Sequence, residues 1–199
     1  MKKIIILLFV ALSYCVNGQV FPKEFQLSAD GTRLTTGGDA TTGFYNESKI
    51  RVIELTFTDD NFWADLTAAG DNDIMAKVTI DGEAFDSIGV RFKGQTSDFR
   101  NNSEKKSFNI TMDAFIDGQD VKGYETLNLN SNYEDPSSIR EILYNHVGRN
   151  YTPGLKTNFA ELYINGTYWG PYENVQQPNG EYLEEWFLSN DGTRWRALA

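Results

Sequence analysis

Cationic side chains gather around a short polar loop in a chain that is otherwise rich in acidic residues. The four cations are Arg91, Lys93, Lys105 and Lys106. The loop after Lys93 begins with Gly94, Gln95, Thr96 and Ser97. Backbone N–H groups, hydroxyls and a lysine together are able to hold a phosphate group. A cationic strand edge that discourages pairing with other chains accounts for the same residues equally well.

The composition argues against nucleophilic catalysis by a Ser–His or Cys–His pair, because the chain has one histidine and one cysteine. The one histidine, His146, lies on the apolar stripe of an expected helix, which favours a core or boundary position. The one cysteine, Cys15, lies inside an expected leader peptide. The expected mature chain therefore has no thiol, no disulfide and no cysteine-based zinc site.

The first eighteen residues have the pattern of a signal peptide. A basic start with Lys2 and Lys3 precedes an apolar run over residues 4–12 and a small residue, Gly18, before the expected cleavage point. The apolar run is too short to cross a bilayer as a helix. We expect an exported protein that ends outside the cell, on its surface or in the periplasm, with no membrane segment after processing. Cys15 as a lipidated residue is the lesser alternative, since Tyr14 precedes it.

The charge balance argues against anionic partners. The formal charge is −10, and it becomes −12 once Lys2 and Lys3 leave with the signal peptide. Nucleic acid and anionic membranes both attract cationic surfaces, so neither is an expected partner.

After an irregular lead-in over residues 19–48, the pattern is mostly one of strands. Apolar residues alternate with polar ones along several segments, and Asp81-Gly82 and Asn165-Gly166 are hairpin turn signals. Asp135-Pro136 begins an amphipathic pattern that predicts a helix of about four turns over residues 136–149. A short helix is expected from Phe62 and a last one from Gly180. The predicted fold class is α+β, a mainly antiparallel sheet with one long amphipathic helix.

Several long segments of the chain resemble the CotH family of secreted and spore-coat protein kinases. They are VRFKGQTS, KKSFNI, YETLNLNSNYEDPSSIRE, YINGTYWGPYENVQQ and EYLEEWF, in this order, over about residues 50–195. The resemblance implies an atypical kinase-like fold of bacterial origin that transfers phosphate from ATP to an extracellular or coat protein with Mg²⁺ or Mn²⁺. It also implies that residues 49–199 form the N-terminal lobe of that fold.

The resemblance implies roles for particular residues. Arg91, Lys93 and the loop from Gly94 to Ser97 would lie near the nucleotide phosphates. Lys105 or Lys106 would contact phosphate, and the two remain alternatives because strand parity puts them on opposite faces. Glu141 would pair with that lysine, although helix phase puts it about 200° from Ile139. Asn174 and Gln176 would lie on the connection between lobes. Many family members have a glutamate at the position of Gln176.

The chain ends at Ala199, before the aspartates that the resemblance implies for catalysis and metal binding. We therefore expect a fragment that lacks its C-terminal lobe and is inactive alone. Two other functions remain open, a nucleotide-binding pseudokinase and a non-catalytic extracellular binding module. The second would use aromatic residues for protein or carbohydrate, namely Tyr163, Tyr168, Trp169 and Tyr172.

Overall fold

Seven strands close into a barrel in the computed structural model of the protein, which describes residues 26–27, 34–35, 40, 42–94, 105–187, 190 and 193–195. The barrel strands are β3 (Arg51–Thr56), β4 (Ile74–Ile80), β5 (Glu83–Lys93), β6 (Ser107–Thr111), β7 (Thr126–Asn130), β8 (Thr157–Ile164) and β9 (Thr167–Gln176). The helices are α2 (Phe62–Ala69), α4 (Arg140–Gly148) and α5 (Gly180–Phe187). A separate two-stranded ladder pairs β1 (Gln26–Leu27) with β2 (Leu34–Thr35).

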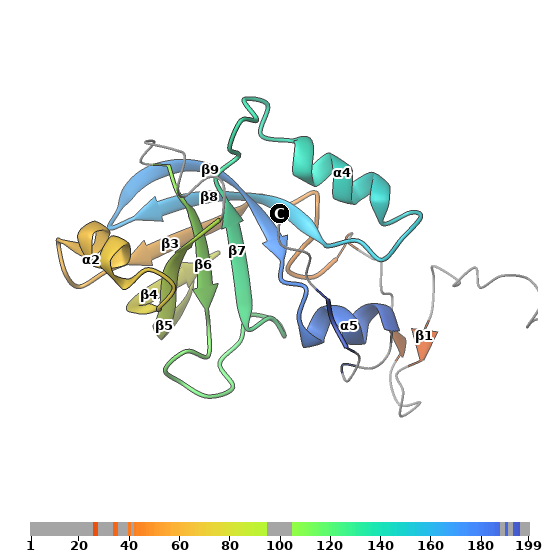
Figure 1. The fold of residues 1–199 in the computed structure, drawn as a ribbon, viewed down its shortest axis with the longest axis horizontal. Helices are drawn as coiled ribbons and strands as arrows, with labels where there is room; N and C mark the ends of the chain where they lie inside the picture. Colours follow the sequence, from red (N-terminus) through yellow and green to blue (C-terminus); the bar gives the residue numbers. More distant parts are fainter. Residues whose placement is uncertain are drawn as a thin grey trace, which may run out of the picture.

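The order around the barrel is β3-β4-β5-β6-β7-β9-β8. All neighbours are antiparallel except β3 and β8, which pair in parallel from Arg51 opposite Ala160 to Leu55 opposite Ile164. This last pairing joins the first barrel strand to one about a hundred residues later. Figure 1 shows α2, α4 and α5 at separate places around the barrel.

Both hairpin turns predicted from the sequence are confirmed. Asp81 and Gly82 have φ values of 51° and 88°, and Asn165 and Gly166 have 48° and 77°. Positive φ at both central residues matches the twist of the flanking strands, and Asn, Asp and Gly tolerate it best. The short helices expected from Phe62 and Gly180 are also present, as α2 and α5.

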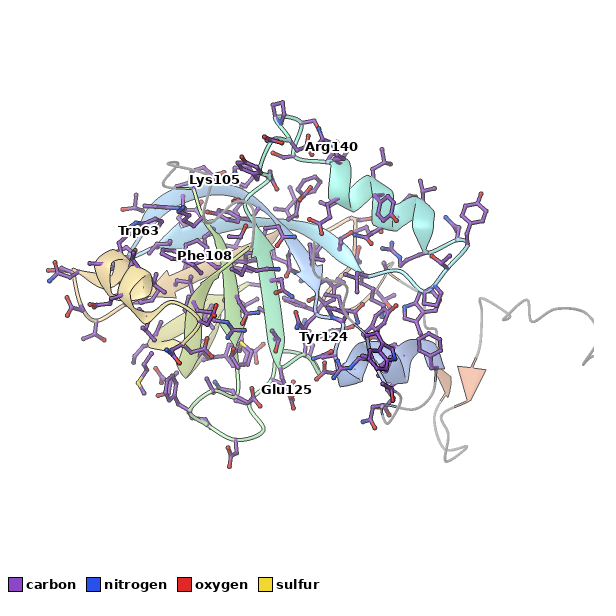
Figure 2. All side chains as sticks on the ribbon, viewed as in Figure 1. Trp63, Lys105, Phe108, Tyr124, Glu125 and Arg140 are labelled. Atoms are coloured by element: carbon purple, nitrogen blue, oxygen red, sulfur yellow. The ribbon has the colours of Figure 1, made fainter. Side chains whose placement is uncertain are left out.

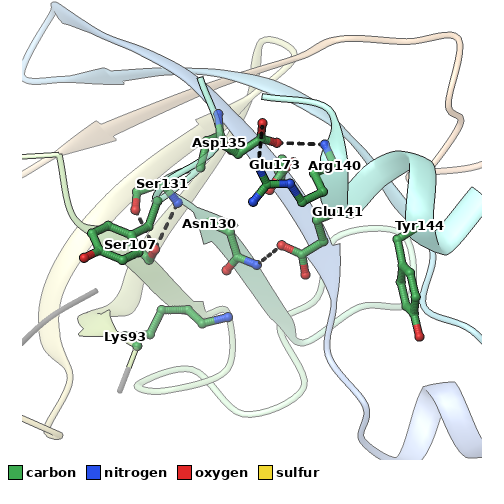
Figure 3. Close-up of a pocket in the computed structure, with 12 residues that line it drawn as sticks. Lys93, Ser107, Asn130, Ser131, Asp135, Arg140, Glu141, Tyr144 and Glu173 are labelled. Carbon is green, nitrogen blue, oxygen red and sulfur yellow. Dashed lines mark hydrogen bonds and ion pairs between the residues drawn. The ribbon is translucent and has the colours of Figure 1, made fainter. Parts of the chain in front are cut away.

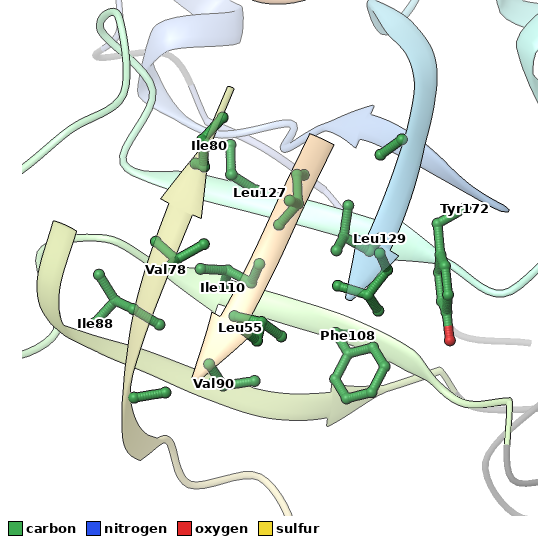
Figure 4. Close-up of a cluster of buried hydrophobic side chains, with 14 of the residues drawn as sticks. Leu55, Val78, Ile80, Ile88, Val90, Phe108, Ile110, Leu127, Leu129 and Tyr172 are labelled. Atoms are coloured by element: carbon green, nitrogen blue, oxygen red, sulfur yellow. The ribbon is translucent and has the colours of Figure 1, made fainter. Parts of the chain in front are cut away.

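Apolar side chains that alternate along the strands fill the inside of the barrel. They include Leu55, Val78, Val90, Ile110 and Leu129, which converge in Figure 4. Since neighbours along a strand point to opposite faces, the residues between them face outward. On β6 and β7 these outward residues are polar, and Asn109 Nδ2 donates to Asn128 Oδ1 at 3.0 Å.

The predicted fold class is wrong. An α+β kinase lobe with a mainly antiparallel sheet and one long amphipathic helix was expected, and the protein is instead a closed barrel with short helices. Alternating strands look the same in an open sheet and in a barrel. Closure depends on the parallel pairing of β3 with β8, which no local pattern encodes.

The long helix predicted over residues 136–149 is correspondingly shorter. Helix α4 starts only at Arg140, because Ser138 has a φ of 53°, outside the helical region. Asp135 still acts as a cap, since its Oδ2 accepts from the backbone N–H groups of Ile139 at 3.1 Å and Arg140 at 2.8 Å. The apolar residues of α4 also face outward in part, and Leu143 is 53% exposed.

Candidate functional site

A pocket of about 650 Å³ lies between the outer face of the barrel and helix α4. It is lined by Lys93, Gly94, Ser107, Asn130, Ser131, Asn132, Tyr133, Asp135, Arg140, Glu141, Tyr144 and Glu173. Figure 3 shows Ser107, Asn130, Ser131, Glu141 and Glu173 close together, with Lys93 below them and Tyr144 set apart on α4.

Strand register accounts for the part of the pocket that the barrel contributes. Lys93 at the end of β5 pairs with Ser107 at the start of β6, and Asn130 at the end of β7 pairs with Glu173 on β9. Phe92, Phe108 and Leu129 point into the barrel, so the residues next to them face outward. Four segments distant in sequence thus present polar side chains at one end of the barrel.

The segment between β7 and α4 forms the second wall. Ser107 Oγ accepts from the backbone N–H of Ser131 at 2.9 Å and lies 3.1 Å from Ser131 Oγ. Hydrogen bonds from the Ser137 hydroxyl and the Arg140 backbone N–H lower the pKa of Asp135 to about 2. Asp135 is therefore a carboxylate that fixes the start of α4, and its neighbour Arg140 reaches back to the Glu134 carbonyl at 3.3 Å.

Two glutamates from different elements meet in this pocket. Glu173 is only 2% exposed, and its Oε1 has no hydrogen-bond partner among the described residues. Burial, and next the charge of Glu141, raise the pKa of Glu173 to about 7. Glu141 Oε2 accepts a hydrogen bond from Asn130 Nδ2 at 2.6 Å. In the amide orientation that satisfies both of its ends, Asn132 donates to Glu173 Oε2 at 3.2 Å.

Lys105 lies beside the pocket and not in its lining. Its Nζ donates to the Pro171 carbonyl at 2.8 Å and sits 5.0 Å from the centre of the Tyr172 ring. Desolvation lowers the pKa of Lys105, and the negative charge of Glu173 works in the opposite direction. The charge of Glu173 therefore acts on Lys105, while the backbone carbonyl of Lys106 accepts from Tyr172 Oη at 3.0 Å.

The pocket brings together three of the residues that the sequence proposed for a phosphate site, Lys93, Gly94 and Glu141. Glu141 does not have the expected pairing, because no ion pair joins it to Lys105 or Lys106 within the described part of the chain. It is half-buried and bound to Asn130, so helix phase alone was also a poor guide to its surroundings. The loop residues Gln95, Thr96 and Ser97 lie outside the described residues.

Three further residues of the proposed set lie elsewhere. Arg91 forms an ion pair with Asp73 at 2.6 Å on the outside of β5. Asn174 is fully buried and donates to Asn158 Oδ1 at 2.8 Å. Gln176 lies beneath α5, where its Nε2 donates to Glu185 Oε2 at 2.7 Å. An amide suits this last position, because a glutamate there would face another carboxylate.

His146 and the aromatic residues also differ from expectation. His146 is exposed and its Nδ1 lies 2.7 Å from Glu47 Oε2, so it is not a core histidine. Tyr172 is buried in the barrel core and Trp169 packs against that core, while Tyr168 is half exposed. These aromatic residues therefore do not share one exposed binding face.

Sequence reasoning missed Glu173, Ser131 and Arg140 as pocket residues. The signal for Glu173 was present, because it is the only charged residue in the strand segment TYWGPYENVQ. That signal becomes informative only with the register of β9 against β7, which places Glu173 opposite Asn130.

The lining residues fit an anionic ligand and a hard cation better than they fit an apolar one. Lys93 and Arg140 supply positive charge, and the serine and tyrosine hydroxyls supply donors. The unpartnered oxygen of Glu173 is a hard ligand of the kind that Mg²⁺ or Mn²⁺ takes. No cluster of three or more His, Cys, Asp or Glu residues with metal-binding geometry occurs in the described ranges.

The model of the CotH kinase protein family matches residues 90–197, which include every residue that lines the pocket. No curated protein matches the chain. The matched segment is more than half of the 199 residues, and the chain therefore belongs to the CotH kinase family.

Proposed function

We propose that the pocket between the barrel and α4 binds the phosphates of ATP, and that the protein takes part in phosphate transfer to serine or threonine residues of other proteins. The chain is kinase-like by its family. The observation that carries the proposal is the meeting of Lys93, Gly94 and Arg140 with two serine hydroxyls in one open pocket inside the matched segment.

The chemistry of phosphoryl transfer agrees with this lining. The enzyme must neutralise charge on the transferred phosphoryl group and hold its oxygens in place, mostly with cations and donors fixed beforehand. Lys93 lies at the end of β5, directly before a glycine that lets the backbone come close to a ligand. Arg140 stands in the first turn of α4, on the opposite wall. Tyr133 and Tyr144 offer aromatic surface for a base.

Export and an extracellular or coat protein substrate belong to the same proposal. They rest on the leader-like pattern of residues 1–18 and on the family. Within the described residues, no helix has the length and apolar character needed to span a membrane.

Calorimetric titration of ATP with Mg²⁺ into the purified chain tests the proposal. We expect Lys93→Ala to weaken ATP binding about tenfold, the loss typical of one charged hydrogen bond. Lys77→Ala is the matched control, because Lys77 is an exposed strand lysine paired with Asp86 and outside the pocket lining. Equal ATP affinity in both variants, or no ATP binding by folded protein, would contradict the proposal.

Phosphate transfer is measured separately, with radiolabelled ATP and a mixture of extracellular proteins. Transfer that is lost in Lys93→Ala supports the kinase. ATP binding without transfer fits a nucleotide-binding pseudokinase and equally a fragment that needs a further lobe for catalysis.

A further inference from the structure

We propose that Glu47 is a positioning residue for the pocket, because its carboxylate holds the last turn of α4 and thereby fixes the helix that forms one wall of the pocket. Glu47 lies outside residues 90–197, the segment that the family model matches. The position of α4 is a property of this chain by itself. Its consequence for nucleotide binding rests on the function proposed above.

Helix α4 buries little apolar surface against the barrel. Of its nine residues, Ile142 and Asn145 are the buried ones, and Asn145 is polar. The side chains of Leu143 and Val147 are about half exposed, and Tyr144 is 76% exposed. Most helices in proteins are held by the burial of an apolar face, and a helix of this length is not stable by itself in water. Polar contacts must therefore supply much of what fixes α4 on the barrel.

Glu47 supplies two of these contacts from one carboxylate. Its Oε2 lies 2.7 Å from His146 Nδ1, and its Oε1 accepts a hydrogen bond from Arg149 Nη2. The Arg149 side chain is 6% exposed, and its Nη1 donates to the Leu155 carbonyl at 2.9 Å. Removing one partner of a buried ion pair leaves an uncompensated charge, so this contact is costly to break. Glu47 thus holds the C-terminal end of α4 at two points.

The segment that carries Glu47 is itself fixed to the barrel. The Glu47 backbone N–H donates to the Ala40 carbonyl at 2.9 Å. The Phe44 carbonyl accepts hydrogen bonds from Arg51 Nε at 2.7 Å and from Asn158 Nδ2 at 2.9 Å, and both of these side chains are buried. Because Arg51 begins β3 and Asn158 lies on β8, Glu47 couples the position of α4 to that of two barrel strands.

The other end of α4 is the one that reaches the pocket. Its first turn contributes Arg140 and Glu141 to the lining and starts at the cap formed by Asp135. Arg149 lies about 13 Å further along the axis, at 1.5 Å per residue. A helix capped at one end and released at the other pivots about the cap, and this moves its lining residues relative to the barrel wall. Displacements of about 1 Å are enough to weaken a binding site that depends on fixed groups.

Amide hydrogen exchange of the full chain, measured by NMR without nucleotide, tests the position of α4. In Glu47→Ala, the amides of α4 should exchange about tenfold faster or more, while those of the barrel strands keep their wild-type rates. Glu47→Gln keeps an acceptor for Arg149 and should show a smaller increase. Asp86→Asn is the matched control, because Asp86 belongs to an exposed ion pair with Lys77 outside the pocket lining. Unchanged exchange of α4 in Glu47→Ala overturns the proposal.

A second measurement does not depend on the stability of any variant. In the wild-type chain, nuclear Overhauser contacts should join the side-chain protons of Glu47 to the ring protons of His146, because the two side chains touch. If these contacts are missing, Glu47 does not hold α4 and the proposal fails.

Titration with ATP separates positioning from a general loss of stability. Glu47→Ala should weaken ATP binding about fivefold in the wild type and much less in Arg140→Ala, because the side chain that it displaces is already absent there. Equal losses in the two backgrounds, or unchanged ATP affinity in Glu47→Ala, would overturn the proposal. If the wild type binds no ATP, faster exchange in α4 still identifies Glu47 as the residue that positions the pocket wall, and only the nucleotide role is removed.

Discussion

Two glutamates at different places on the barrel, Glu185 and Glu173, have opposite surroundings. Glu185 on α5 accepts hydrogen bonds from Tyr124 Oη at 2.7 Å, Lys156 Nζ at 3.0 Å and Gln176 Nε2 at 2.7 Å. Glu173 on β9 has one buried oxygen, Oε1, with no hydrogen-bond partner in the described part of the chain, and the charge of Glu141 acts on it. Figure 2 shows Tyr124 next to α5, well away from Lys105 beside the pocket.

The comparison separates a structural acid from a functional candidate. Donors and a cation satisfy Glu185, so its contacts help to hold α5 against the barrel, beside the hydrogen bonds of Tyr182 and Trp186 to the segment before β8. Glu173 Oε1 has no hydrogen-bond partner among the described residues, so the pocket is where the barrel keeps a buried acceptor available for a ligand. Burial alone would not have distinguished them, because both are largely shielded from water.

The largest loss of stability is expected when the carboxylate of Glu185 is removed. Glu185→Ala leaves Lys156, which is 12% exposed, and two other donors without their acceptor. We expect a loss of about 2–3 kcal/mol in the free energy of unfolding, measured by urea denaturation. Glu54→Ala, which changes an exposed glutamate on β3, is the control. A change in Glu185→Ala no larger than in this control would show that the α5 contacts are not what holds the helix.

A smaller loss of stability is expected when Glu185 is given a second carboxylate as its neighbour. Gln176→Glu replaces the amide that donates to Glu185 and recreates there the kind of acid pair found in the pocket. The free energy of unfolding should fall by about 2 kcal/mol at pH 8 and recover at lower pH, where one carboxyl of the pair takes up a proton. A loss of equal size at pH 5 and pH 8 would argue against charge repulsion as its cause.

The pH dependence of stability provides the third test. The pKa of Glu173 rises from 4.5 to about 7 on folding, so the folded chain binds the extra proton between these values. The contribution of Glu173 to stability is thus complete below pH 4.5 and is lost as the pH rises through about 7. Thermal melts without metal should show a loss of up to about 3 kcal/mol across this range that Glu173→Gln lacks. If the stability of the wild type and of Glu173→Gln changed with pH in the same way, the raised pKa of Glu173 would not be the cause.

The smallest effect is expected at the start of α4. Asp135→Ala removes the acceptor for the Ile139 and Arg140 backbone N–H groups, so the melting temperature should fall slightly at neutral pH. The pKa of Asp135 is lowered on folding, so its contribution is present at neutral pH and disappears as the pH falls from 3.8 toward about 2. The difference between wild type and variant should shrink over that range. If the difference in melting temperature between wild type and Asp135→Ala did not depend on pH, the charge of Asp135 would not contribute to capping α4.

Part of the candidate site was accessible from the sequence. VRFKGQTS identified Lys93 and Gly94, and the family resemblance singled out Glu141; all three line the pocket. Arg91 was proposed with them because it lies two residues from Lys93, but a local ion pair with Asp73 takes its charge. Glu173 was missed because its importance depends on strand register and on the position of α4.

The sequence alone determined the local structure and the family. Asp-Gly and Asn-Gly dipeptides dictate turns with positive φ, and strict alternation of apolar residues dictates strands, since both follow from the backbone geometry of a few neighbouring residues. Only the tertiary structure decided the closure of the barrel, the late start of α4 and the meeting of Glu141 with Glu173. Each of these depends on contacts between residues far apart in the chain, and their geometry is fixed only when the whole barrel has packed.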